Sequence, residues 1–451
     1  MKMNQFFYLL CWVLAIVTTG TTTSGKESKK LNIVLIMADD VGYECFSAYG
    51  SKEFSTPRLD ALAARGMRFD HCHSTPLCTP SRVNLMTGKS NVFNYVDFGV
   101  FPKGEPTFAN HFKEHGYMTA VAGKWQLLTK KNGISPREAG FDRHCVWNIP
   151  GTERRRYWEP SLMHDGKVIN HGEEKYGSTV IADYLIDFIK TNQDKPFLAY
   201  YPMNLPHSPF DPTPRSVNRS NKDGKQNFID MVAYMDHCVG RIEDTLIELG
   251  LRENTLMIFT ADNGTSSSLT LDFFGTERKG GKGYTHDHGT KVPLILNLPG
   301  RISAGQVNMD LICFSDLFPT IVEAADLPLK KIDQGDGWSF WPQCLGKEGK
   351  KREWIYGYYF PRPFSKQFDM KYSHWEVAWA RNKQYKLYRD GRFFDVIEDV
   401  REETPLGKRV DLGAVHNSLQ AALDEYPLRG GKIDYEQVTG VRKAPGTKKK
   451  K

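Results

Sequence analysis

Four short apolar runs between residues 31 and 260 are the feature that most constrains the fold of this chain. They are rich in β-branched or aromatic residues and bounded by chain breakers, so each is expected to form a buried strand. The runs cover residues 31–37, 118–122, 196–201 and 255–260. Helical stretches are expected at residues 59–67, 176–190 and 228–249. This alternation predicts an α/β fold with a large mixed, mostly parallel sheet flanked by helices.

Polar, chemically capable residues follow each of these four runs. In chain order they are Asp39-Asp40, Gly123-Lys124-Trp125, Pro206-His207 and Asp262-Asn263. Ligands of open α/β sheets bind beyond the carboxyl ends of the strands. We therefore expect the four strand ends to meet around one shared site.

Two of these strand ends carry the donors of a hard metal ion. Asp39, Asp40, Asp262 and Asn263 offer oxygen ligands, which suit calcium or magnesium rather than zinc. The adjacent carboxylates would repel each other without a cation between them. The alternative is that each pair caps a turn, since Asp-Asn-Gly is a common turn sequence. Their position at two strand ends favours the metal.

The segment from Pro76 to Lys89 contains Cys78 and a predicted helix start at Pro80. The free N–H groups and the dipole of a helix start favour a tetrahedral anion, and Arg82 could fork onto two of its oxygens. Cys78 would then lie at the mouth of an anion pocket. The alternative from this segment alone is a half-buried disulfide cysteine beside a helix start.

The first 24 residues have the layout of a secretory signal, in which a lysine precedes an apolar run and small and polar residues follow it. The run, residues 6–17, is too short to span a bilayer comfortably, and no later apolar stretch is long enough. We therefore expect a secreted or periplasmic protein with no stable membrane span.

Export changes the interpretation of the eight cysteines, because disulfides persist outside the cytosol. Cys11 belongs to the signal, and no CxxC pair supports a zinc site. Six further cysteines could form disulfides whose pairing the sequence does not specify: Cys45, Cys72, Cys145, Cys238, Cys313 and Cys344. The net charge of +7 favours anionic partners, but no aromatic-interleaved basic motif points to nucleic acid.

The residue pattern changes after about Gly346, where segments begin that are rich in aromatic residues and in places alternate between apolar and polar residues. Asp390-Gly391 is a hairpin signal between residues 386–388 and 393–395. We expect a catalytic domain at residues 25–345 and a smaller C-terminal α+β domain at residues 346–451, with an antiparallel sheet and a basic tail.

The segment around Cys78 resembles the signature of type I sulfatases, the formylglycine-dependent branch of the alkaline phosphatase superfamily. The signature reads Cys-x-Pro-Ser-Arg and is followed here by Thr87-Gly88. Further landmarks of that family have counterparts in order along the chain. They are Asp39–Tyr43, Thr56–Asp60, Gly66–Phe69, Gly335–Ser339 and Phe394-Asp395 through Pro405.

The resemblance implies a nucleophile and a metal. In that family a maturation enzyme converts the cysteine, here Cys78, to formylglycine, and one hydroxyl of the hydrated aldehyde attacks sulfur. The family's ion is calcium, with magnesium the second choice. Its ligands would be Asp39, Asp40, Asp262, Asn263 and the modified Cys78.

The resemblance also implies a set of sulfate-binding residues. Arg82, Lys124, His207 and Lys282 would neutralise the sulfate, and His207 or Lys282 would protonate the departing alcohol. Gln126 departs from the pattern, because the family commonly has a histidine there, and glutamine cannot titrate. His286-Asp287-His288 also departs from it. Those residues are either specificity determinants or ordinary exposed loop residues.

The implied function is hydrolysis of sulfate esters, with sulfated poly- or oligosaccharides as the expected substrates. One alternative is a phosphodiesterase or phosphonate hydrolase of the same superfamily, because the metal carboxylates alone do not exclude it. A second alternative is a non-catalytic module that binds sulfated glycans, which Gln126 motivates.

Overall fold

The protein is represented by a computed structural model that describes residues 29–129, 132–329, 335–360, 377–407 and 410–427. The predicted signal at residues 1–24 and the basic tail at residues 448–451 lie outside the described residues. A ten-stranded sheet forms the centre of the molecule, with strand order β12-β2-β11-β8-β1-β7-β3-β4-β5-β6.

Strands β8, β1, β7, β3 and β4 run parallel at the centre of this sheet, and antiparallel pairs join β11, β5 and β6 to it. The ten strands are β1 (Asn32–Ala38), β2 (Met67–His73), β3 (Met118–Lys124), β4 (Arg143–Trp147), β5 (Ser161–His164), β6 (Lys167–Asn170), β7 (Phe197–Pro202), β8 (Thr255–Ala261), β11 (Lys291–Asn297) and β12 (Gln306–Cys313). The four predicted strands are therefore β1, β3, β7 and β8, and the predicted mixed sheet is confirmed.

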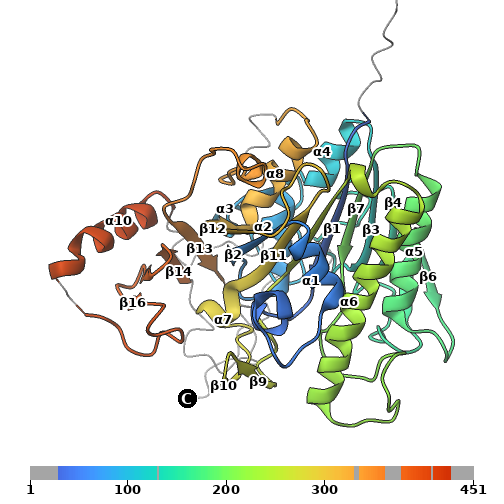
Figure 1. Cartoon of the computed structure of the whole chain (residues 1–451), viewed down its shortest axis with the longest axis horizontal. Helices are drawn as coiled ribbons and strands as arrows, with labels where there is room; N and C mark the ends of the chain where they lie inside the picture. The colour runs from blue at the N-terminus through green and yellow to red at the C-terminus, as the bar shows by residue number, and fades with distance from the viewer. Residues whose placement is uncertain (1–28, 130–131, 330–334, 361–376, 408–409, 428–451) are drawn as a thin grey trace, which may run out of the picture.

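Helices cover both faces of the sheet (Figure 1). One face carries α1 (Pro57–Ala64), α5 (Gly177–Thr191) and α6 (Gly224–Glu248). The other carries α2 (Cys78–Thr87), α4 (Phe108–Glu114) and α8 (Leu317–Ala324). The short helices are α3 (Asn91–Asn94), α7 (Asp287–Thr290) and α9 (Trp341–Cys344), with 3-10 turns at Tyr43–Cys45, Ser47–Tyr49, Arg252–Asn254, Phe314–Asp316 and Val410–Leu412.

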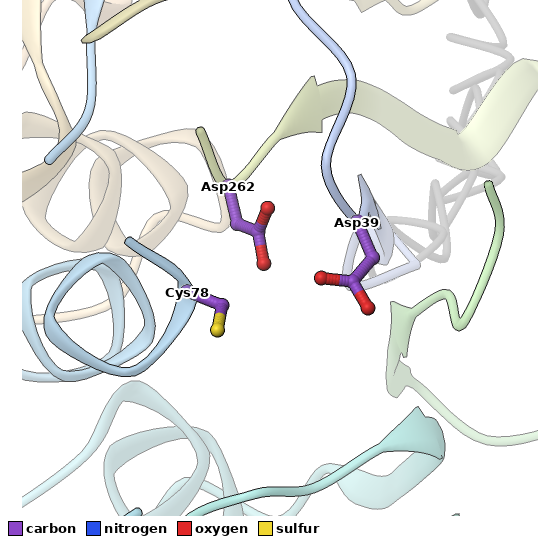
Figure 2. A group of neighbouring side chains, drawn as sticks. All are labelled: Asp39, Cys78 and Asp262. Atoms are coloured by element: carbon purple, nitrogen blue, oxygen red, sulfur yellow. The ribbon is translucent and has the colours of Figure 1, made fainter. Parts of the chain in front are cut away.

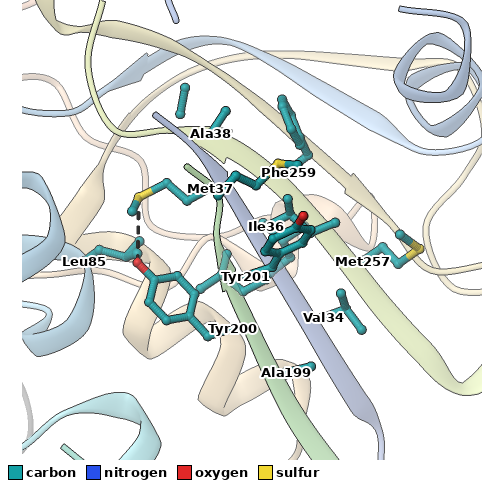
Figure 3. Close-up of a cluster of buried hydrophobic side chains, with 14 of the residues drawn as sticks. Val34, Ile36, Met37, Ala38, Leu85, Ala199, Tyr200, Tyr201, Met257 and Phe259 are labelled. Atoms are coloured by element: carbon teal, nitrogen blue, oxygen red, sulfur yellow. Dashed lines mark hydrogen bonds between the residues drawn. The ribbon is translucent and has the colours of Figure 1, made fainter. Parts of the chain in front are cut away.

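The central strands are mostly apolar because both of their faces are buried. Figure 3 shows side chains of β1, β7 and β8 packed together, with Leu85 of α2 against Tyr200. The Tyr200 hydroxyl lies 3.9 Å from the sulfur of Met37, so even this polar group is enclosed. The dense core fixes the strand ends, and with them the polar residues that follow.

A second, antiparallel sheet of four strands lies in the C-terminal part of the chain, at the left of Figure 1. Its strands are β13 (Ile355–Tyr359), β14 (Val377–Arg381), β15 (Tyr385–Tyr388) and β16 (Phe393–Asp395), and α10 (Gly413–Asp424) packs on it. A small hairpin of β9 (Thr270–Phe273) and β10 (Thr276–Lys279) lies apart from both sheets. The expected hairpin at Asp390-Gly391 is confirmed by the antiparallel pairing of β15 with β16.

Three predicted helix boundaries are wrong. The helix expected at residues 228–249 begins at Gly224, where the side chain of Asp223 accepts from the first turn. The helix expected at residues 59–67 ends at Ala64, and Met67 opens β2. The chain turns at Gly66, where a Cβ atom would lie 2.3 Å from the carbonyl oxygen of Leu296. The helix expected to open at Pro80 begins at Cys78 instead, and proline is tolerated in that first turn because its N–H would have no intrahelical partner.

The possible disulfides are not formed among the described residues. The free cysteines there are Cys45, Cys72, Cys78, Cys145, Cys238, Cys313 and Cys344. All are buried except Cys313, so they pack as small apolar side chains. None of the helices in the described part of the chain combines the length and apolar character that crossing a membrane requires.

Candidate active site

The carboxylates at the end of β1 are completely enclosed. Asp39 and Asp40 have 0% and 1% of their surface exposed, and the backbone of Asp40 has a φ of 65°. A residue other than glycine in this left-handed region is strained, and such strain concentrates at functional sites. The strain turns the chain directly after β1, as the sheet gives way to the site.

The neighbouring strand β8 brings a second polar pair, Asp262 and Asn263, to the same point. The backbone N–H of Asp40 donates to Asp262 Oδ1 at 3.1 Å, and Asn263 Nδ2 donates to Asp40 Oδ1 at 3.0 Å. These bonds join residues more than two hundred positions apart in sequence. The parallel pairing of β1 with β8 produces this meeting.

Two oxygens in this group are buried without a hydrogen-bond donor among the described residues: Asp39 Oδ2 and Asn263 Oδ1. Buried polar atoms are normally paired, so two unpaired oxygens in one cluster call for a partner from outside the chain. Ligand atoms of Asp39, Cys78 and Asp262 lie within 4.8 Å of one another, as do those of Asp39, Asp40 and His207. The donor set, dominated by carboxylate and amide oxygens, fits a hard divalent cation.

Cys78 is the first residue of α2, and its side chain is 1% exposed. Figure 2 shows Cys78, Asp39 and Asp262 converging on one small space from α2, β1 and β8. Burial raises the pKa of the Cys78 thiol, while Lys124 and Lys282 act against that shift. An unmodified thiol there stays protonated near neutral pH and is a poor nucleophile.

Two buried cations brace this cluster. Arg82, on the first turns of α2, donates to Asp262 Oδ2 at 3.0 Å and to the backbone oxygen of Lys124 at 2.7 Å. Lys124, the last residue of β3, donates from Nζ to Asp39 Oδ1 at 2.7 Å. Because both side chains are almost fully buried, their positions are fixed before any ligand arrives.

Lys282 and His207 close the site on the opposite side of Asp40. Lys282 Nζ donates to Asp40 Oδ2, and His207 Nε2 lies 3.3 Å from the same oxygen and 3.4 Å from Lys282 Nζ. Their side chains are 16% and 18% exposed, whereas the carboxylates are at most 2% exposed. Among the charged groups around Asp40, His207 and Lys282 are therefore the ones that reach solvent.

The charges in the site determine which groups are ionised. Burial opposes ionisation of Asp39, but Lys124 and the other cations hold the pKa of this carboxyl well below its usual range. Burial and then the charge of Asp39 raise the pKa of Asp262. Burial lowers the pKa of His207 to about 4, against the pull of Asp40 and Asp39. The pocket thus holds a carboxylate that stays charged beside an imidazole that stays neutral.

Gln126 lies two residues beyond Lys124 and is 8% exposed. Its φ is 56°, so it is the second strained residue that follows a strand of the site. Oε1 of Gln126 is buried and finds no donor within the described ranges. The structure therefore brings every predicted site residue to one edge of the sheet, while the catalytic and metal-binding roles assigned to them remain predictions.

Three supporting residues were not anticipated. Thr265 accepts from the N–H of Gly42 at 2.9 Å and donates to the buried Glu44, whose pKa burial raises to about 7. Tyr157 donates to the backbone oxygens of Asn204, at 2.6 Å, and His207, and so holds the His207 loop. Glu44 could have been noticed as an acid in the motif after Asp40, but no local signal marks Tyr157.

The interpretation of His286 and His288 as ordinary exposed loop residues is wrong. His288 is buried, His286 is mostly enclosed, and Asp287 between them pairs with Arg381 of β14. Burial lowers the pKa of His288 to about 4. This stretch belongs to the contact between the two sheets, which a local stretch of sequence cannot reveal.

Comparisons with known proteins agree with this geometry. A family model described as Sulfatase matches residues 31–327, and one described as N-sulphoglucosamine sulphohydrolase, C-terminal, matches residues 279–427. Human arylsulfatase A is 32% identical over 365 residues, which cover 72% of this chain and 70% of that protein.

Two further relatives extend the likeness to bacterial and solved proteins. N-acetylgalactosamine-6-O-sulfatase of Bacteroides thetaiotaomicron is 28% identical over 413 residues, which cover 74% of this chain and 80% of that protein. The crystal structure of Ps i-CgsB superimposes with a TM-score of 0.74 at 25% identity, covering 88% of this chain and 93% of the other. The match to the solved structure includes both sheets, since it covers most of each chain.

Proposed function

This chain belongs to the sulfatase family, and on that premise we propose that it removes sulfate from sulfated poly- or oligosaccharides through a formylglycine made from Cys78. Hydrolysis of sulfate esters follows from the family itself. One observation carries the mechanistic proposal: Cys78 opens α2 within 4.8 Å of the ligand atoms of two buried aspartates. Among the relatives, a protein named N-acetylgalactosamine-6-O-sulfatase motivates a sulfated sugar as the substrate.

We assign the metal site to Asp39, Asp40, Asp262 and Asn263, joined by the modified residue 78. The unpaired buried oxygens of Asp39 and Asn263 and the repulsion among three buried carboxylates support this assignment. Calcium fits the oxygen donors best, with magnesium as the second choice. When bound, the ion would neutralise sulfate charge and lower the pKa of a nearby hydroxyl group.

The proposed formylglycine would supply a hydroxyl nucleophile where the buried thiol of Cys78 stays protonated. This modification requires a maturation enzyme as a partner of the chain. Position 78 suits the role because it lies at the open N–H groups of a helix start, beside the cations Arg82 and Lys124. Asp262, held by Arg82, is placed to take the proton of that hydroxyl.

The remaining side chains bind the sulfate and handle the leaving group. Lys124, fixed by Asp39, and Arg82 stabilise negative charge deep in the pocket, and Lys282 does so at its mouth. Of the two predicted proton donors to the departing alcohol, His207 and Lys282, we assign the role to Lys282, because burial keeps His207 neutral. Lys282 is protonated at neutral pH, because the attraction of Asp40 outweighs burial and raises its pKa.

Gln126 replaces the family's usual histidine without removing the rest of the site. Its amide can orient a hydroxyl at position 78 through hydrogen bonds, but it cannot exchange a proton. We propose an active enzyme, since Asp262 and His207 provide titratable groups in the two clusters that share Asp39. Gln126→His should then give an enzyme with an additional titrating group in its pH–rate profile. An inactive wild-type protein that binds sulfated glycans would contradict the proposal.

The setting of the enzyme is proposed from the sequence. The signal-like residues 1–24 suggest a secreted or periplasmic protein. The boundary near residue 345 is proposed as the division between a catalytic and a C-terminal domain, in line with the separate antiparallel sheet that begins at Ile355.

The test is a substrate panel combined with mass spectrometry of the peptide that contains residue 78. Nitrophenyl sulfate, phosphate and phosphonate esters are compared with sulfated glycans from several sources, and sulfate release is measured. We expect release from sulfate esters and a residue 78 with the mass of formylglycine. Preference for the phosphonate or phosphate ester would favour the alternative hydrolase, and full activity with an unaltered cysteine would exclude the formylglycine.

A further inference from the structure

A basic segment, residues 154–158, packs against the loop that carries His207. Tyr157 donates to the backbone oxygen of His207, and Arg156 donates to that of the next residue, Ser208. The segment lies between β4 and β5, and the loop follows β7, so the contact joins residues about fifty positions apart. Because His207 is one of the groups of the site that reach solvent, Arg156 lies beside the solvent-facing side of the site.

Arg156 is half-buried and held flat by aromatic rings. Its guanidinium lies 4.3 Å from the ring centroid of Trp147 and 5.6 Å from that of Tyr157. Within the described ranges, no carboxylate lies within ion-pair distance of Arg156, and its Nε is buried without an acceptor. A guanidinium fixed in this way loses little freedom on binding an anion and presents its planar fork ready-made.

A second stacked cation comes from the loop before α6. Arg219 lies 4.0 Å above the ring of Trp158, whose indole N–H donates to the Pro212 oxygen at 2.8 Å. The side chain of Arg219 is exposed, and the part of the chain that the structure describes offers it no carboxylate within ion-pair distance. Two arginines are therefore stacked on tryptophan rings: Arg156, which donates to the residue after His207, and Arg219, which covers the ring two residues after Arg156. We call Arg156 and Arg219 the stacked arginines.

The other charged groups near the stacked arginines leave this surface positive. Lys222 is exposed, and Asp211 is half-buried between Lys222 and Arg156. Burial raises the pKa of Asp211, although Arg156 and Lys222 act against that shift, and none of these three described residues forms an ion pair with another. Asp211 therefore faces two cations, Arg156 and Lys222, and neutralises neither of them through an ion pair.

Arg155 shows what a neutralised arginine of the same segment looks like. Its Nε lies 3.1 Å from Glu153 Oε2, and its Nη1 lies 2.8 Å from Glu159 Oε2. The two acids leave Arg155 no net charge to offer a ligand, although its side chain is more exposed than that of Arg156. The run of three arginines is therefore not a uniform solvated patch.

We propose that the stacked arginines form a second anion subsite, which binds a sulfate or carboxylate on the sugar next to the one that carries the reacting sulfate. The substrate class is then a glycan with several anionic groups per oligosaccharide, rather than an isolated sulfate ester. This inference rests on the proposed function, because it takes the neighbouring cluster at Cys78 as the place of sulfate hydrolysis.

The experiment compares Arg219→Ala with Arg155→Ala on two kinds of substrate. Nitrophenyl sulfate has no second anion, whereas chondroitin sulfate oligosaccharides carry sulfates and carboxylates, and carrageenan oligosaccharides carry sulfates alone. Arg219→Ala is expected to lower kcat/KM on a charged oligosaccharide about tenfold, mainly through KM, and to leave nitrophenyl sulfate unaffected. Arg155→Ala should change neither. The oligosaccharide that shows the larger loss identifies which anion the subsite takes.

A second variant guards against a purely structural effect. Arg156→Ala removes the contact with Ser208, so it is compared with Arg156→Lys, which keeps the charge but loses the planar fork and part of the stacking. The subsite predicts a loss on charged oligosaccharides for both variants, smaller for lysine and smaller again as salt rises. Equal losses on nitrophenyl sulfate and the oligosaccharides would mean displacement of His207 and would overturn the proposal.

Binding separates this inference from the question of activity. The Cys78→Ala protein is titrated calorimetrically with the same oligosaccharides, with and without Arg219→Ala. Weaker binding by the double variant supports the subsite even if no sulfate ester is turned over by the wild type. Equal binding by the two proteins overturns the subsite, whatever the activity of the wild type.

Discussion

The active-site end of the main sheet and the contact between the two sheets are both rich in buried charge. They differ in whether the chain itself supplies a hydrogen-bond partner to each carboxylate oxygen. At the contact, both oxygens of Asp316 accept from the chain, including Arg352 Nε at 3.1 and 2.9 Å. Glu402 likewise accepts from Lys386 at one oxygen, at 2.8 Å, and from Tyr388 at the other. Asp39 has one oxygen bonded to Lys124 and the other bonded to nothing in the described chain.

This difference in hydrogen bonding distinguishes buried carboxylates that stabilise the fold from those that bind a ligand. A buried carboxylate that the chain itself satisfies holds two parts of the fold in register, and it needs nothing more. A buried carboxylate with an unpaired oxygen costs stability, so it persists only where something outside the chain completes it. The following experiments disrupt one region or the other. Changes at the active site should lower activity, and changes at the contact between the sheets should lower stability.

Removal of Cys78 should have the largest effect, and on activity alone. Cys78→Ala deletes the proposed nucleophile, so turnover of nitrophenyl sulfate should fall by roughly 10⁴-fold or more. The melting temperature should change little, because only one sulfur atom leaves a rigid helix start. Cys344→Ala, which removes a buried cysteine of α9, is the control and should keep full activity. Surviving turnover in Cys78→Ala would rule the mechanism out.

Removal of the ion should affect activity and stability together. A chelator should abolish turnover and lower the melting temperature, and added calcium should restore both better than magnesium does. An ion at one hundred times its Kd would stabilise the fold by about 2.7 kcal/mol. In Asp39→Asn the response to calcium should largely disappear. A melting temperature that ignores calcium in chelator-treated wild-type protein would argue against the metal site.

Disrupting the contact between the two sheets should lower stability and leave catalysis unchanged. Arg352→Ala leaves Asp316 buried with an unpaired charge, so unfolding free energy should fall by about 4 kcal/mol in denaturant titrations. The value of kcat at temperatures well below the melting transition should stay close to that of wild type, because neither residue touches the site. A selective loss of kcat without loss of stability would show that the two regions are coupled.

The pair formed by Asp287 and Arg381 should give the smallest effect, and one that depends on pH. Burial opposes ionisation of Asp287, but Arg381 holds its pKa below the usual range. A depressed carboxyl pKa adds stability above the unfolded value of about 4, and that stability is lost as pH falls through the folded pKa. Asp287→Asn should therefore cost about 2 kcal/mol at pH 7, since asparagine can still accept one bond.

Denaturant titrations of wild type and Asp287→Asn between pH 7 and pH 3 measure this dependence. The difference between the two proteins should shrink as the pH falls below about 4, because the carboxyl group of Asp287 then binds a proton in the unfolded chain but not in the folded one. A difference that stays constant over this range would mean that the charge of Asp287 is not what stabilises the contact.

The sequence was informative wherever structure follows from a local pattern. The runs that became β1, β3, β7 and β8 are apolar because both sides of a central strand are buried, and the residues that end them must then lie at one edge. The strand pattern alone therefore places Asp39 and Asp262 together. The antiparallel sheet near Asp390 followed in the same way from its turn.

The errors and omissions concern contacts between distant segments. His288 could be interpreted as an exposed loop residue because its cover comes from another segment, the β9–β10 hairpin, whose Phe273 ring lies 4.3 Å from the His288 ring. The run Arg154–Arg156 carries no sign that one arginine pairs with acids and the next stacks on Trp147. Packing of this kind depends on the whole fold, and no window of sequence contains it.

Helix α2 is buried along its entire length, and residues 336 and 337 hold its far end through Ser90 and Gly88. No other enzyme can reach a side chain as deeply enclosed as Cys78 without dismantling this helix. The proposed oxidation is accordingly expected before α2 packs into the fold, and the speed of folding then sets the time available for it. Substitutions that delay collapse of the chain without weakening the finished protein should raise the yield of aldehyde per molecule.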